Sequence, residues 1–126
     1  MGIYHGLNVT PEREPQPTDP VGAGIKHDGG KPRFDLLRFG CPNSLEGVAK
    51  VLTFGAKKYA DHSWQTVEHG VTRYWSAMER HMNAIAKGEE RDEESGELHT
   101  DHIACNALFL GDLLRKQYDG STNRSD

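Results

Sequence analysis

Side chains that can bind metal ions interrupt the apolar face of a segment near the C-terminus. Drawn as a helix, residues 98–117 place His99 and Asn106 on the face of their aliphatic stripe. His102 lies beside that face. Burying such groups without partners costs about 1–3 kcal/mol each or more. We therefore expect these polar side chains to have binding partners in the folded protein. A metal ion is favoured as that partner over hydrogen bonds to a neighbouring helix.

Two further segments carry polar groups on or beside their apolar faces. Glu79 shares a face with Trp75, and Glu46 lies beside the stripe of its own segment. Glu46 also stands three residues after Asn43, as in a helix cap, so a capping role is equally open. His81 lies on an apolar face too, but a single inward histidine more often packs in a core. The convergence of these groups from three helices predicts a metal site in a helical bundle.

Basic and aromatic residues near these segments could hold a substrate. The basic ones are Lys31, Arg33, Lys58, Arg73 and Arg80. Carboxylates with imidazoles bind cations, while Arg and Lys bind phosphate, so the set predicts a metal–polyphosphate site. Some of these cations are expected to be ordinary surface residues. Trp64 or Tyr59 could stack on a base, and plain packing of their rings is as open a reading.

Several other kinds of chemistry are excluded or disfavoured. The run Gly-Gly-Lys-Pro-Arg at 29–33 lacks the spacing of a phosphate-binding P-loop, and no strand precedes it. No Ser-His-Asp or Cys-His arrangement can be argued, and Cys105 stands among apolar neighbours as a core residue would. The net charge of −4 argues against a general nucleic-acid binder. The longest apolar stretch, 103–114, is broken by polar residues, which excludes a membrane span.

Three amphipathic helices must position these groups. The apolar spacing predicts them at 43–60, 71–87 and 98–117, with Gly88 ending the second. Residues 89–97 hold six acidic residues and one arginine and are predicted to form a solvated connector, from which Asp92 or Glu94 could reach an ion. With no strand-like alternation, the fold class is all-α, a helical bundle.

The N-terminal third differs in composition. All six prolines precede residue 43, so long helices are not expected there. Residues 1–24 are predicted to be extended or flexible. Residues 25–40 combine a Gly-Gly turn with apolar anchors and are predicted as a docked loop. The expected organisation is one helical domain at 25–118, followed by a flexible tail at 119–126.

The length of 126 residues fits one domain with a modest core, since 35% of the residues are hydrophobic. Helices with large apolar residues on an open face predict a homo-oligomer, either a dimer or a tetramer. Two cysteines are too few for a disulfide framework, and no signal pattern begins the sequence. A cytoplasmic location is therefore expected.

Four stretches of the sequence resemble a known enzyme family. They are KHDGGKPRFDLL (26–37), LEGVAKVLTFGAKKYADHSW (45–64), RYWSAMERHMNAIAKGE (73–89) and ESGELHTDHIACNALFL (94–110). They are similar in order and spacing to the phage and bacterial dATP/dGTP diphosphohydrolases, a MazG-like branch of the all-α nucleoside triphosphate pyrophosphatases. The resemblance is closest in kind to the MazZ proteins of phages that replace adenine by 2-aminoadenine.

The resemblance implies an activity and a cofactor. It implies hydrolysis of dGTP or dATP to the monophosphate and pyrophosphate, with dGMP supplied for 2-aminoadenine nucleotide synthesis. It implies Mg²⁺ or Mn²⁺, two or more ions per site, on a bundle that oligomerisation completes. Glu46 and Glu79 would be catalytic and would bind metal together with His99, His102 and Asn106.

The sequence also departs from the wider MazG-like pattern. That pattern has Glu-Glu-x-x-Glu on one helix and Glu-x-x-Asp on another, whereas only Glu46 of the first motif is present and His102 and Asn106 stand where the second would be. Two alternatives stay open. One is an HD-type triphosphohydrolase, although the order Asp101-His102 is reversed. The other is a nucleotide-binding module without turnover.

Overall fold

A computed structural model describes residues 27–122 of the chain, all as helices and connecting loops apart from a single bridge between Arg91 and Leu98. The helices are α1 (Phe34–Gly40), α2 (Pro42–Lys58), the short 3₁₀ helix η1 (Ser63–Thr66), α3 (Gly70–Ala86) and α4 (His99–Thr122). The all-α prediction is confirmed. The segment 1–24 lies outside the described residues. None of the described helices is long and apolar enough to cross a bilayer.

The chain divides into two compact units, Met1–Leu45 and Glu46–Asp126. In the first, the described part holds α1 and the first turn of α2. The predicted docked loop contains this unforeseen short helix, and Phe34, Leu36 and Leu37 on it are exposed. These apolar residues of the predicted loop belong to a helix of seven residues, about two turns, which begins after Pro32, the last proline before α1.

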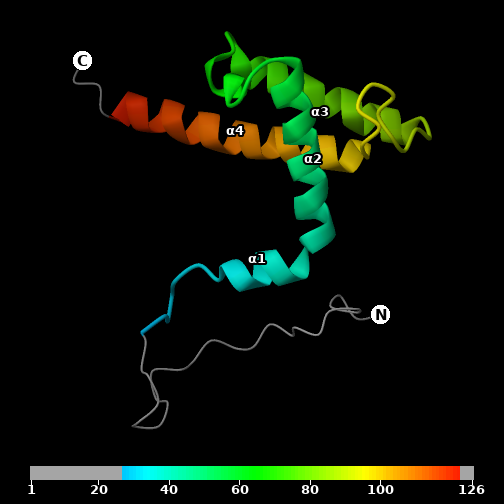
Figure 1. Cartoon of the computed structure of the whole chain (residues 1–126). Helices are drawn as coiled ribbons and strands as arrows, with labels where there is room; N and C mark the ends of the chain where they lie inside the picture. The colour runs from blue at the N-terminus through cyan, green and yellow to red at the C-terminus, as the bar shows by residue number, and fades with distance from the viewer. Residues whose placement is uncertain (1–26, 123–126) are drawn as a thin grey trace. The chain divides into compact units, whose positions relative to one another are not determined.

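The second unit is built on α3 and α4, which pack along each other as an antiparallel pair (Figure 1). Val48 and Val51 of α2 pack against Cys105 of α4, and these three residues form the buried apolar cluster. A second cluster is aromatic. Phe109 lies between Trp64, with ring centroids 4.3 Å apart, and Tyr74, at 5.0 Å.

The helix boundaries agree with the predicted ones to within a few residues, with local reasons for each difference. α2 begins at Pro42, a residue suited to the first helical position because it has no N–H to leave unbonded. The cap predicted at Asn43 is therefore wrong. α4 continues to Thr122, four residues into the segment predicted as a tail. Gly88 ends α3 as predicted, with φ of +96°.

Candidate metal and phosphate site

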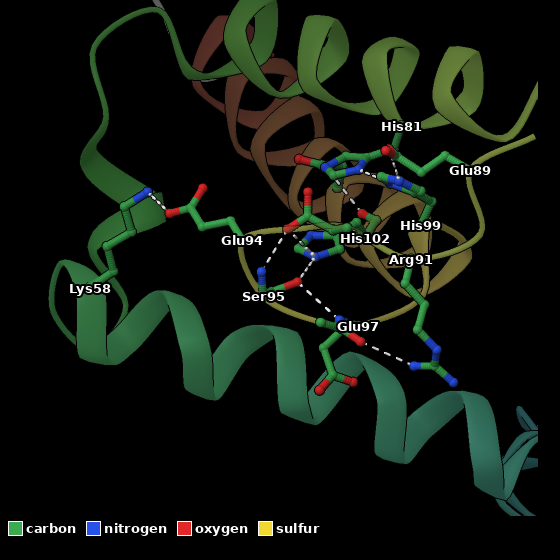
Figure 2. Close-up of polar contacts among 12 residues, drawn as sticks. Lys58, His81, Glu89, Arg91, Glu94, Ser95, Glu97, His99 and His102 are labelled. Carbon is green, nitrogen blue, oxygen red and sulfur yellow. Dashed lines mark hydrogen bonds and ion pairs between the residues drawn. The ribbon is translucent and has the colours of Figure 1, made fainter. Parts of the chain in front are cut away.

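Three histidine rings from α3 and α4 gather at one end of the helix pair (Figure 2). His81 Nδ1 and His99 Nδ1 share a hydrogen bond of 2.8 Å. The His81 ring also stacks on His102, with centroids 4.4 Å apart and planes 11° apart. His99 is only 3% exposed, so this cluster forms part of the interior.

The acidic connector closes over these rings. Glu89 Oε2 lies 2.8 Å from His99 Nε2, and Ser95 Oγ shares a 2.7 Å hydrogen bond with His102 Nε2. Asp92 Oδ2 lies 3.8 Å from the same nitrogen of His102. The histidine centre is defined here as His81, His99 and His102 with Glu89, Asp92 and Ser95. Ser95 and Asp92 both lie next to Nε2 of His102. A Ser-His-Asp relay needs the serine and the aspartate at opposite ring nitrogens, so these residues do not form one.

Local sequence places Glu89 at this centre. The N–H of Gly88 bonds to the carbonyl of Ile85, and the N–H of Glu89 bonds to that of Ala84. This pair of bonds is the Schellman ending of a helix, which needs a residue with positive φ at position 88. The chain therefore turns sharply after Lys87, and Glu89 follows directly against His99.

The connector is mostly exposed to solvent, in keeping with the prediction, and its own hydrogen bonds close it into a loop. The N–H of Asp92 bonds to the carbonyl of Glu97, and the N–H of Gly96 bonds to that of Asp92. The Asp92 carboxylate accepts the N–H of Ser95 at 2.8 Å. These bonds hold the Asp92 carboxylate and the Ser95 hydroxyl toward the first turns of α4.

Burial sets the protonation of the centre. It lowers the pKa of His81 to about 4, with the neighbouring His102 and His99 acting in the same direction. Burial also lowers the pKa of His102, against the opposing effect of Asp92. For Asp92, burial raises the pKa, but the hydrogen bonds from Ser95 outweigh it and the net shift is downward. At neutral pH the centre thus holds an ionised Asp92 beside the neutral imidazoles of His81 and His102.

Three of these groups are arranged as metal ligands would be. One donor atom each from His81, Asp92 and His99 lie within 4.8 Å of one another. Two imidazoles and a carboxylate suit Fe²⁺, Zn²⁺ or Mn²⁺, whereas Mg²⁺ favours oxygen ligands alone. The residues present therefore fit a divalent ion, and fit Mn²⁺ better than Mg²⁺.

The predicted metal ligands divide between this centre and the surface. His99 and His102 belong to the centre, and buried Asn106 donates to the carbonyl of His102 at 2.9 Å, one turn away. Glu46 is exposed and pairs with Lys50 at 3.6 Å. Glu79 is exposed on α3. The structure gives neither glutamate a contact with the histidines, and their catalytic role stays a prediction.

The predicted phosphate-binding residues lie in both units. In the second unit, Lys58 forms an ion pair with Glu94, which raises the pKa of Lys58, and Arg73 and Arg80 are exposed on α3. In the first unit, Lys31 Nζ lies 3.8 Å from Asp28 Oδ1. Arg33, also in the first unit, bonds the Asp35 carboxylate, which lowers the pKa of that carboxyl.

The two aromatic candidates for base stacking differ. Trp64 stacks on Phe109, and its carbonyl accepts the Tyr74 hydroxyl at 3.3 Å, so it is used in packing. Tyr59 is 71% exposed, with the Lys58 ammonium 5.3 Å from its ring centroid. Tyr59 is therefore the ring that remains open to a ligand.

Sequence reasoning underrated some members of the centre. His81 was expected to be a packing residue, because one histidine on an apolar stripe carries no partner information. Glu89 and Ser95 were not singled out. The signals present were the glycines at 88 and 96, which mark the turns that place Glu89 and Ser95.

The part of the chain that holds this site is similar to known proteins. Residues 21–123 match the sequence profile of the family described as "dATP/dGTP diphosphohydrolase, N-terminal". The chain belongs to this family. The matched residues include the whole histidine centre and every residue predicted to bind metal or substrate. The resemblance noted from the four sequence stretches is therefore confirmed at the level of the family.

One relative of this family member is a protein named "dATP/dGTP diphosphohydrolase" from Salmonella phage PMBT28. The two sequences are 34% identical over 94 residues, which is 75% of this chain. The chain spans about a third of the length of that relative, since the aligned part covers 31% of it. No solved structure matches the chain.

Proposed function

We propose that this chain carries the active site of a metal-dependent deoxynucleoside triphosphate pyrophosphohydrolase. The reaction is hydrolysis of dGTP or dATP between the α- and β-phosphorus atoms, which gives the monophosphate and pyrophosphate. The observation that carries the proposal is the match of residues 21–123 to the dATP/dGTP diphosphohydrolase family. The histidine centre supports it, because it gathers the buried His99 and the half-buried His81 and His102 within that matched region.

A divalent ion, Mg²⁺ or Mn²⁺, is the proposed cofactor, and it would neutralise phosphate oxygens and acidify a bound water. His81, Asp92 and His99 are the residues suited to hold it. His102 is a neutral imidazole able to take a proton at Nε2. Asp92, whose carboxylate lies 3.8 Å from that nitrogen, would stabilise the imidazolium formed.

Cationic side chains are proposed to hold the phosphates. Arg73 and Arg80 are seven residues apart on α3, hence two turns apart on one face, and both are exposed. Lys58 contacts Glu94 in the connector that supplies Asp92, so its ammonium lies beside the loop of the histidine centre. Lys31 and Arg33 are proposed to contribute from the N-terminal unit, and Glu46 and Glu79 to add carboxylate ligands.

The biological role follows from the product. We propose that dGMP released by the enzyme feeds 2-aminoadenine nucleotide synthesis in the cytoplasm of a phage-infected bacterium. The relative's phage origin supports this setting. A homo-oligomer is part of the proposal, because large apolar side chains on α3 are exposed.

Product analysis tests the proposal. The chain is incubated with dGTP or dATP and Mn²⁺ or Mg²⁺, and the products are separated by anion exchange. We expect the nucleoside monophosphate and pyrophosphate in equal amounts. Release of tripolyphosphate would instead identify a triphosphohydrolase, and binding of dGTP without any product would identify a nucleotide-binding module. Either result overturns the proposal.

A further inference from the structure

We propose that His81, Asp92 and His99 bind a single nitrogen-favouring transition-metal ion, of the Zn²⁺, Fe²⁺ or Mn²⁺ class, and that Glu89 is the positioning residue for His99. This narrows the class of the proposed ion and adds a residue that orients one of its ligands. It rests on the proposed function only for the use of the ion in hydrolysis. The binding site itself rests on the geometry of the histidine centre.

The distance between the histidine nitrogens fits a shared ion. The two Nδ1 atoms of His81 and His99 are 2.8 Å apart, and the Asp92 donor lies within 4.8 Å of both ligand atoms. Imidazole nitrogens bind such ions at about 2.0–2.1 Å, so two of them on one ion are separated by roughly 3 Å. The two rings are therefore already near the spacing that a shared ion requires.

Three separate elements bring these ligands together. His81 comes from α3, His99 from the first turn of α4 and Asp92 from the connector between them. The connector is held in place by its own backbone bonds and by the Asp92–Ser95 hydrogen bond. A site fixed from three sides loses little conformational freedom when an ion binds, which favours affinity.

Glu89 determines which nitrogen of His99 carries the proton. The Glu89 carboxylate can only accept a hydrogen bond, so the 2.8 Å contact places the proton of His99 on Nε2. The lone pair of His99 is then on Nδ1, where it accepts the hydrogen bond from His81 Nδ1–H. An ion bound between the two Nδ1 atoms takes the place of that proton, which moves to His81 Nε2 or to solvent. A carboxylate behind a ligating histidine is the usual way in which proteins fix its tautomer and orientation.

The site also has access to solvent. The side chain of His99 is 4% exposed, but that of Asp92 is 23% exposed. A site with a buried His99, a half-buried His81 and a partly exposed Asp92 carboxylate can accept an ion from water and can keep contact with a further ligand. Three protein ligands leave room for such a ligand, as in catalytic rather than structural metal sites.

The test is metal binding by the full chain, measured apart from activity. Protein treated with a chelator and desalted is titrated with Co²⁺, followed by visible absorption, and with Zn²⁺ and Mn²⁺ by calorimetry. The variants are His81→Gln, Asp92→Asn and Glu89→Gln. The matched control is His69→Asn, which removes an exposed histidine and keeps a residue that tolerates its φ of +57°. Circular dichroism verifies the fold of each variant.

We expect one Co²⁺ or Zn²⁺ per chain in the wild type and in His69→Asn. His81→Gln and Asp92→Asn should weaken binding by about 100-fold or more, and Glu89→Gln by about 10-fold, as for partners behind a ligand. Absence of stoichiometric binding, or equal affinity of the folded His81→Gln variant, overturns the site. If the metal site fails this test but the chain still releases pyrophosphate, the proposed function is retained and only this site is rejected. If the chain binds metal but does not hydrolyse dGTP, the site is retained and the proposed function is rejected.

Discussion

At the scale of single residues, burial decides which side chains are reactive. The chain has two cysteines that differ in this respect: Cys105 is 2% exposed in the apolar cluster, and Cys41 is exposed. Burial raises the pKa of the Cys105 thiol to about 12, so it stays protonated at any ordinary pH. A protonated and enclosed thiol is a poor nucleophile.

This difference predicts selective alkylation. In the native protein at pH 8, iodoacetamide should modify Cys41 alone, and Cys105 should react only when denaturant is added. Peptide mass spectrometry at successive times measures both rates. Modification of Cys105 at a rate similar to that of Cys41, without denaturant, would show that the α2–α4 cluster is open.

At the scale of elements, the crossing of α2 and α4 depends on one missing side chain. A Cβ atom at Gly47 would overlap the Asp101 carboxylate, whereas a Cβ at Gly55 in the same helix would meet no atom within 4 Å. Gly47 therefore allows α2 to approach the first turn of α4, where His99 and His102 lie. The position of the histidine centre relative to α2 is set partly by this contact.

Two alanine substitutions in α2 test the crossing. Gly47→Ala should lower the free energy of unfolding by about 1–3 kcal/mol, because the helices must shift or Asp101 must move. Gly55→Ala should raise it by about 0.5–1 kcal/mol, because alanine favours helix. Urea unfolding measures both. Asp101→Ala should recover part of the loss in Gly47→Ala, and a Gly47→Ala protein as stable as Gly55→Ala would rule out the close contact.

The sequence predicted α2, α3 and α4 because their apolar residues recur at three and four positions, a signal that does not depend on tertiary contacts. It did not predict α1, because Pro32 and the glycines around it favour a loop reading. The closure of the connector into a loop was not predicted, for a different reason. Six acidic residues look solvated in sequence, and only the bonds from Asp92 to Ser95, Gly96 and Glu97 show that the loop closes.

The candidate site could also be predicted from the sequence only in part. His99, His102 and Asn106 could be predicted because they break an apolar stripe on one helix. His81 could not be ranked above a packing residue, since its partners come from α4 and from the connector. Glu46 was favoured by a motif pattern, and the structure shows it exposed beside Lys50.

At the scale of the whole molecule, the chain leaves apolar side chains without cover. Trp75, Met82 and Ile85 lie on one side of α3 and are between 39% and 53% exposed. Among residues with described burial, only Val48, Val51, Cys105 and Leu110 are buried apolar residues. A core this small favours a second copy of the chain as the cover for α3, since oligomers commonly complete the burial of small domains.

Light scattering after size exclusion tests this self-association. We expect a dimer or a tetramer at micromolar concentration. Trp75→Glu should dissociate it, because burying an unpaired carboxylate in an apolar interface is costly. Ser76→Glu, an exposed position about 100° around the helix, should not. A wild-type protein that stays monomeric would contradict the prediction.

We propose that the histidine centre carries out hydrolysis of deoxynucleoside triphosphates. The most direct measurement is the rate of pyrophosphate release from dGTP, at a fixed Mn²⁺ concentration, for the wild type, His99→Gln, His81→Gln and His69→Asn. If so, the wild type and His69→Asn have normal rates, and chelation abolishes release. This role of the histidine centre makes a further prediction for its variants. It predicts a loss of about 100-fold or more for the two folded variants of the centre, above the effect of an outer partner. Near-normal pyrophosphate release by folded His81→Gln and His99→Gln would contradict it.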